Sequence, residues 1–171
     1  MATNVIETRE VSATPTVDTS IYASGDCIGS VLTFSNALRS YTSTGRVIQA
    51  SILDKTAAST LAACSLWLFS ASPSSSTTTD QAAFNLHDSD IAKVCSVLVF
   101  SSSEVVDGGT ANQFLQLTEI ARPVRGTPPT TLATGDSTLY GLLVSGGTPT
   151  FGAASDVIVR LTIECDQGGY D

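Results

Sequence analysis

The chain has 171 residues, of which 42% are hydrophobic and only 14% are charged, and its formal net charge is −8. This length fits a single domain, and an acidic chain with only eight lysine and arginine residues lacks the positive charge that general nucleic-acid binding requires. No apolar run approaches the roughly 18 residues of a membrane-spanning helix, so we expect no membrane contact.

Short apolar or alternating segments recur along the chain and predict β-strands. In chain order they cover residues 27–34, 47–53, 61–69, 94–100, 113–120, 138–144 and 157–165, with weaker candidates at 5–11 and 14–17. Turns rich in Gly, Ser and Asp separate them. The sequence therefore predicts an all-β domain, a jelly-roll or Greek-key β-sandwich or barrel of about eight or nine strands.

Two segments between these strands are expected to have a structure other than a regular strand of the sheet. One short helix is predicted near residues 88–93, where Asp88 or Ser89 can act as the N-cap. Residues 122–131 contain Pro123, Pro128 and Pro129, so we expect an extended crossing that joins no central ladder.

The first dozen residues leave two interpretations open. Residues 13–171 are expected to form the single sandwich domain, and residues 1–12 either an N-terminal arm or its first strand. An arm could add a strand to a neighbouring subunit. On that interpretation Val5, Ile6, Arg9 and Val11 are candidate contacts with a partner.

Residues 61–69 and 94–100 are apolar on both faces, which is typical of central strands or of strands whose outer face meets another subunit. Trp67 and Phe69 are therefore candidate interface residues. Because Trp67 lies within an apolar run, packing in the core or at an interface is favoured over a sugar-binding platform.

The sequence offers no motif for catalysis, a cofactor or a metal. His87 lies near serines and acids, but no G-x-S-x-G motif accompanies it, and Asp88 and Asp90 lack the glycine and glutamate of a calcium loop. We expect no enzyme activity. The four cysteines are expected to be buried free thiols in a reducing cytoplasm, with disulfides or a metal site as the alternatives: Cys27, Cys64, Cys95 and Cys165.

Several motifs resemble, in order, those of a widespread group of tailed-phage virion proteins. Residues 14–26 resemble its opening T-P-T-V-D-T-S-x-Y-A-S-G-D, and residues 66–77 are similar to its L-x-L-F-x-x-x-P-S-S-T pattern. Residues 80–93 resemble D-N-A-A-F followed by D-x-D-[LI]-A-K. Residues 139–144 and 147–151 resemble L-Y-G-x-L-V and G-T-P-T-[YF]. Together the matches extend over nearly the whole chain.

The resemblance implies a capsid decoration, or cement, protein with a jelly-roll-like fold. Such a protein would form homotrimers at local threefold positions, bind the lattice of the major capsid protein on the outer surface of the virion, and be assembled in the cytoplasm of the host bacterium. The alternative is a tail or fibre-associated structural protein that binds host glycans.

Overall fold

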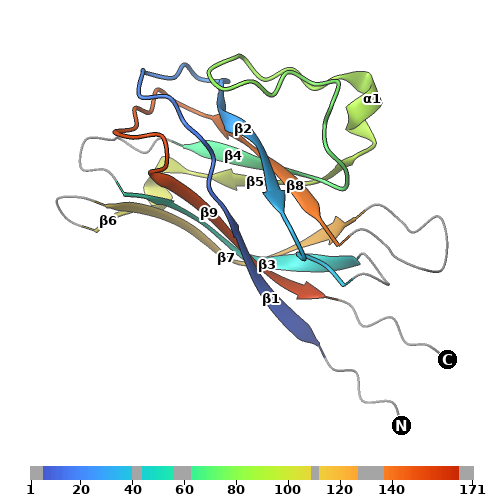
Figure 1. The fold of residues 1–171 in the computed structure, drawn as a ribbon. Helices are drawn as coiled ribbons and strands as arrows, with labels where there is room; N and C mark the ends of the chain where they lie inside the picture. The colour runs from blue at the N-terminus through green and yellow to red at the C-terminus, as the bar shows by residue number, and fades with distance from the viewer. Residues whose placement is uncertain (1–5, 40–43, 56–62, 109–111, 127–136, 166–171) are drawn as a thin grey trace, which may run out of the picture.

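The computed structural model describes residues 6–39, 44–55, 63–108, 112–126 and 137–165. Within these ranges the chain forms two antiparallel β-sheets, one short α-helix and one 3₁₀ helix (Figure 1). The elements are β1 (Glu7–Ala13), β2 (Cys27–Phe34), β3 (Thr44–Asp54), β4 (Cys64–Phe69), α1 (Asp88–Ile91), β5 (Val94–Phe100), η1 (Ser102–Glu104), β6 (Val105–Asp107), β7 (Gln113–Arg125), β8 (Leu139–Ser145) and β9 (Val157–Cys165). No helix in this part of the chain has the length and apolar character needed to cross a bilayer.

The strand order is that of a jelly roll. The five-stranded sheet runs β1-β9-β3-β7-β6, and the four-stranded sheet runs β2-β8-β4-β5. Strands from the first half of the chain pair with strands from the second half in reverse order, β1 with β9, β2 with β8, β3 with β7 and β4 with β5. This long ribbon then folds over, so that β3 also pairs with β9 and β4 with β8. The predicted all-β sandwich is confirmed, in its jelly-roll form.

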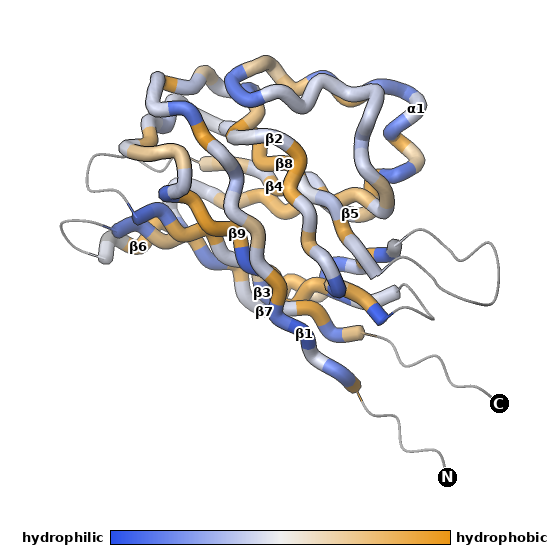
Figure 2. Tube along the Cα trace, in the orientation of Figure 1, coloured by the Kyte–Doolittle hydropathy of each residue, from blue (hydrophilic) through white to orange (hydrophobic). Residues whose placement is uncertain are grey.

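The main core lies between the two sheets. In β9 the odd-numbered residues from Val157 to Cys165 are buried, whereas Arg160 is exposed, as the period-two pattern predicts. Figure 2 shows that the hydrophobic segments concentrate in the strands of both sheets. The expected division into an apolar inner face and a more polar outer face therefore holds for this strand.

A second hydrophobic cluster lies on the outer face of the four-stranded sheet. Its buried members are Cys27, Phe69, Leu142 and Val144. The segment 70–93, which contains α1, covers this face (Figure 1) and contributes Phe84 and Leu86. This cover explains why β4, a central strand, is apolar on both faces. Strand β5 lies instead at the edge of the sheet.

The extended crossing expected over residues 122–131 is wrong for residues 122–125, which continue a strand. β7 continues to Arg125, and Pro123 lies opposite Arg46 of β3. A proline is tolerated there because β6 pairs only with the first three residues of β7, so the second half of β7 is an edge. Pro128 and Pro129 lie outside the described residues.

Three smaller differences concern local structure. The N-cap of α1 is His87, and neither Asp88 nor Ser89 takes that place. Residues 14–17 form no strand, and the three-residue strand β6 was not predicted. Strands this short carry too little sequence pattern to be recognised.

Candidate interaction surface

Strand β1 contains two of the four predicted N-terminal contact residues, and it pairs with β9 of its own chain. Val11 packs against the main core, and Arg9 donates hydrogen bonds to Glu7 and to the carbonyl oxygens of Asn36 and Leu38. Ile6, just before the strand, is 62% exposed. Val5 lies outside the described residues. In this structure Arg9 and Val11 therefore stabilise the subunit itself, and of the three predicted contacts within the described residues Ile6 is the exposed apolar one.

Trp67 and Phe69 lie in the second hydrophobic cluster. Phe69 is fully buried within the subunit, so it has no surface that a partner could contact. The Trp67 ring packs against Phe84 with ring centroids 5.1 Å apart, and its Nε1 donates to Ser65 Oγ at 3.2 Å. The ring thus serves to attach the covering segment 70–93 to the sheet.

His87 acts as a helix cap. Its Nδ1 accepts the backbone N–H of Ser89 at 3.1 Å and lies 2.8 Å from the Ser89 hydroxyl. Among the described residues no carboxylate is bonded to the exposed imidazole ring, so the serine contact is not extended into a triad. These are the contacts expected of a residue that begins a helix.

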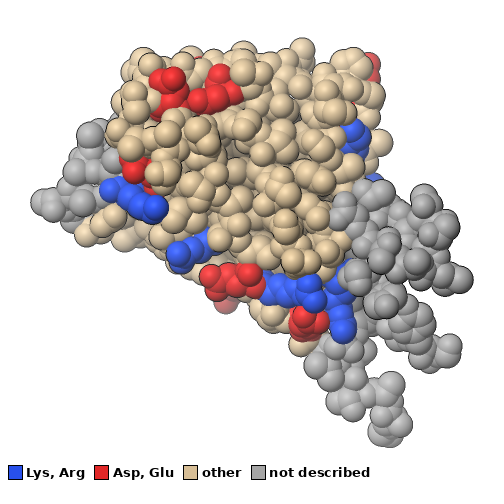
Figure 3. Space-filling model, viewed as in Figure 1, with Lys and Arg blue, Asp and Glu red and all other residues tan. Residues whose placement is uncertain are grey.

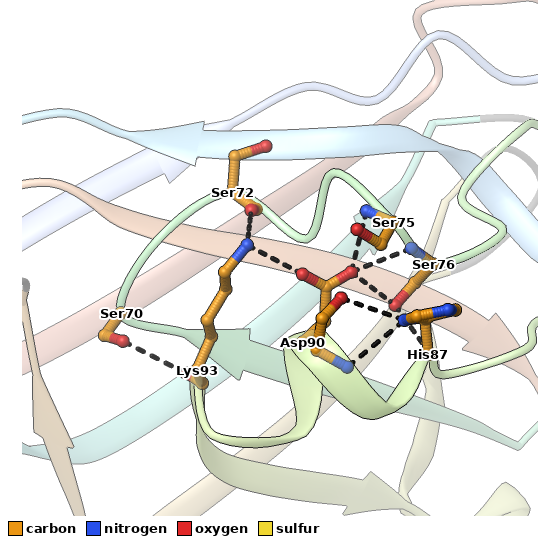
Figure 4. A network of polar contacts seen from close by, with 8 residues as sticks. Ser70, Ser72, Ser75, Ser76, His87, Asp90 and Lys93 are labelled. Carbon is orange, nitrogen blue, oxygen red and sulfur yellow. Dashed lines mark hydrogen bonds and ion pairs between the residues drawn. The ribbon is translucent and has the colours of Figure 1, made fainter.

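Asp90 is the polar centre of the covering segment (Figure 4). Its buried carboxylate accepts hydrogen bonds from the backbone N–H groups of Ser75 and Ser76 and from the Ser76 hydroxyl, each at 2.8 Å, and pairs with Lys93 Nζ at 2.7 Å. Burial alone would raise the pKa of Asp90, but these hydrogen bonds outweigh it and hold the pKa well below its usual range. The segment is therefore held together by an ionised, buried carboxylate.

A second polar network joins the segment 14–26 to the rest of the molecule. The Tyr22 hydroxyl donates to Asp80 Oδ1 and accepts the backbone N–H of Asp18, both at 2.7 Å, and Gly29 N–H donates to the same Asp80 oxygen at 2.6 Å. Burial and the bond to Asp80 raise the pKa of Tyr22 well above its usual value. The Tyr22 ring also packs edge-on against Phe151.

These two networks were not predicted as sites, although the sequence contained a signal for them. Asp18, Tyr22, Asp80 and Asp90 all fall within the motifs that carry the resemblance to phage virion proteins. In the structure they connect the segments 14–26 and 70–93 to the sandwich, so their role is to stabilise the fold.

All four cysteines are free, as expected, and three of them are buried. Burial raises the pKa of the Cys27 thiol to about 11 and that of Cys64 to about 12, and it also raises that of Cys165. Cys95, by contrast, is partly exposed.

We expect Cys95 to be the first thiol that Ellman's reagent modifies in the native protein, because the thiolate is the reactive form and the other three are buried. Counting released thionitrobenzoate at pH 8 checks this. Cys95→Ser should remove the fast phase and leave the other thiols reactive after denaturation. Rapid modification of Cys64 in the native protein would contradict the structure.

Two surface cavities lie among the described residues. The larger, about 450 Å³, lies where β3, β5 and β7 meet and is lined by Gly45, Val94, Cys95, Pro123 and Val124 among others. The smaller, about 140 Å³, lies on the outer face of the five-stranded sheet beside Arg160. The described residues contain no group of three or more His, Cys, Asp or Glu side chains that could hold a metal ion.

Charges are distributed unevenly along the strands. At one end of the sandwich, here called the arginine end, β1 and β3 begin and β7 and β9 end. It carries Arg9, Arg39, Arg46, Lys93, Arg122 and Arg125, partly balanced by Glu7, Asp88, Asp90 and Glu164. The opposite end, the acidic end, carries Asp18, Asp26, Asp54, Asp80, Glu104 and Asp156. Lys55 is the one lysine or arginine described there.

A broad uncharged surface lies on one face of the sandwich. Figure 3 shows acidic side chains at the upper margin of one face and a row of mixed charges along the lower margin, with an uncharged area between them. Such a surface suits contact with other protein surfaces better than with polyanions.

No family model matches the sequence, and no curated protein matches it. Among solved structures, a chain from Desmodium yellow mottle tymovirus is similar, with a TM-score of 0.36 and 8% identity over 100% of this chain and 93% of that chain. At this TM-score and identity the likeness supports no conclusion about the family or the function of the chain.

Proposed function

We propose that the chain is a structural protein of a tailed-phage virion, and specifically a decoration protein that binds the assembled capsid lattice. The observation that carries the proposal is the ordered series of motifs between residues 14 and 151 that resembles phage virion proteins. Tyr22, Asp80 and Asp90 of these motifs hold the loops of a jelly roll in place. Shared fold-determining residues support a shared architecture, and the role on the capsid is the proposed step.

The proposed mechanism is stabilisation by mass action. A protein that binds the assembled lattice and not the free capsid subunit raises the free energy of disassembly, because its contacts must break first. Assembly as a trimer strengthens this effect, since one bound subunit holds the other two near their sites at high effective concentration. The weakly charged surface fits such protein contacts, and the acidic end fits a location away from packaged DNA.

Binding to phage heads tests the proposal. We expect the purified protein to be a trimer by light scattering and to bind expanded empty heads of its phage in a fixed ratio to the major capsid protein. Densitometry of purified virions should give copy numbers in the hundreds, as a lattice of sites requires. A protein that ignores heads and labels tail tips in immunogold microscopy would contradict the proposal and favour a tail or fibre role.

A further inference from the structure

Most sheet edges of the sandwich are protected against pairing with another strand. Open edges attract other strands, and inward-pointing charges, bulges, proline and short strands are the usual protections. β1 carries Glu7 and Arg9 on its inner side, where they form an ion pair. β2 is interrupted by a bulge that contains Gly29, against which Pro15 packs.

The far edge of the five-stranded sheet is protected as well. β6 has only three residues. Beyond it, β7 contains an irregularity opposite β3, where Glu119 and Ala121 have positive φ angles of 57° and 43°. Pro123 then removes a backbone donor from the same edge.

β5 differs from these edges. After an irregularity at its start, Ser96–Phe100 pairs in regular register with β4 and contains neither a charge nor a proline. Within the described residues its backbone pairs with β4 alone, so the other side of the strand is open. Val99 on this strand points outward and is 68% exposed. An apolar, regular and unprotected edge is a favourable site for adding a strand.

We propose that β5 of a second copy of this chain pairs antiparallel with this β5, around a twofold axis at Leu98. Full overlap of Ser96–Phe100 places Leu98 opposite its own copy and Val97 opposite Val99 of the other chain. The four-stranded sheet then continues across both copies. Such a contact is isologous, because the same surface serves both subunits.

Charge complementarity indicates a second copy in this orientation. β5 runs from Lys93 at the arginine end to Glu104 beyond its last residue at the acidic end. An antiparallel copy sets the acidic end of each chain beside the arginine end of the other, whereas a parallel copy sets acid beside acid. The strand itself brings no charge into the contact.

This pairing goes beyond the proposed function and does not require it. On a capsid it would join neighbouring trimers across local twofold axes. In solution it would appear as reversible self-association of the purified chain, weakened by salt because opposite charges lie side by side.

The first test is sedimentation equilibrium over a range of concentrations. Val99→Lys should weaken self-association by about tenfold or more, because each pair then buries two lysines at an uncharged contact. Val106→Lys is the matched control, since Val106 on β6 is 60% exposed and belongs to the other sheet, and it should associate like wild type. A wild type that shows no association beyond a monomer or a stable trimer, or that associates no more strongly than Val99→Lys, would overturn the proposal.

The second test fixes the orientation. In the Val97→Cys/Val99→Cys double variant, made together with Cys95→Ser because Cys95 is a partly exposed thiol on the same strand, oxidation followed by peptide mapping should find residue 97 of one chain linked to residue 99 of the other. Links of 97 to 97, or no link between these positions, would overturn the antiparallel pairing. If the disulfide forms but the protein does not bind heads, the proposed function is refuted and the β5 pairing is not. If the protein binds heads but the disulfide does not form, the β5 pairing is refuted and the proposed function is not.

Discussion

Replacing Gly29 with alanine is expected to lower the free energy of unfolding by about 2 to 5 kcal/mol, which combines backbone strain with overpacking. Gly29 has φ of +72°, a conformation that residues with a Cβ rarely adopt. A Cβ there would also lie 2.5 Å from Pro15 Cβ. The substitution therefore pushes the segment 14–26 away from β2.

Gly25→Ala is the matched control for this prediction. Gly25 also has a positive φ, +94°, but a Cβ there meets nothing within 4 Å. Strain alone should cost about 1 to 2 kcal/mol. Urea unfolding followed by circular dichroism measures both variants. Equal losses would show that the contact between Pro15 and β2 does not stabilise the fold.

Asp90→Asn is expected to lower the free energy of unfolding at pH 7 by about 2 to 3 kcal/mol, because it removes a buried, charge-assisted hydrogen-bond acceptor. The expected loss of free energy is smaller than for a fully buried ion pair, because Lys93 is 28% exposed to solvent. The loss should be accompanied by loosening of the cover over Trp67, whose fluorescence emission then shifts to longer wavelength.

The stability that Asp90 contributes should decrease as the pH falls. Its pKa is lowered in the folded protein from an ordinary value of 3.8, so the stability that it contributes is complete well above that value. As the pH falls through about 4 toward the folded pKa, the unfolded chain takes up the proton first and this contribution is lost. The difference between wild type and Asp90→Asn should therefore be constant from pH 5 to 7 and shrink below pH 4.

Asp88→Asn serves as the control for both measurements. Asp88 lies in the same helix but is exposed, so its loss should change the free energy of unfolding by about 0.5 kcal/mol or less. A difference between wild type and Asp90→Asn that grows as the pH falls would contradict a lowered pKa for Asp90.

The stability of the covering segment bears on the proposed role. The segment 70–93 contains five serines among its first seven residues and carries few apolar side chains, so it could not form a core of its own. Asp90 supplies the bonds that order it, and Phe84 and Leu86 attach it to the sheet. If this face contacts a capsid, the segment is already ordered, so binding would not lose free energy to ordering it.

Local sequence patterns determined much of the architecture. Period-two alternation in β9, the apolar runs of β4 and β5 and the glycine-rich turns between strands were enough to predict an all-β sandwich. The same patterns placed Cys64, Cys95 and Cys165 in apolar runs, and Cys64 and Cys165 are buried, whereas Cys95 on the edge strand β5 is partly exposed. Each of these features depends on neighbouring residues along one strand, which a sequence displays directly.

The order of the strands and the roles of the polar residues were decided only by the tertiary structure. Pro123 is compatible with β7 because β6 ends before it, and Asp90 is buried because Ser75 and Ser76 fold back over it. The open edge of β5 likewise depends on which strands lie beside it in the sheet. Such properties arise from contacts between residues distant in sequence, and the hydrophobic pattern of a single segment does not encode them.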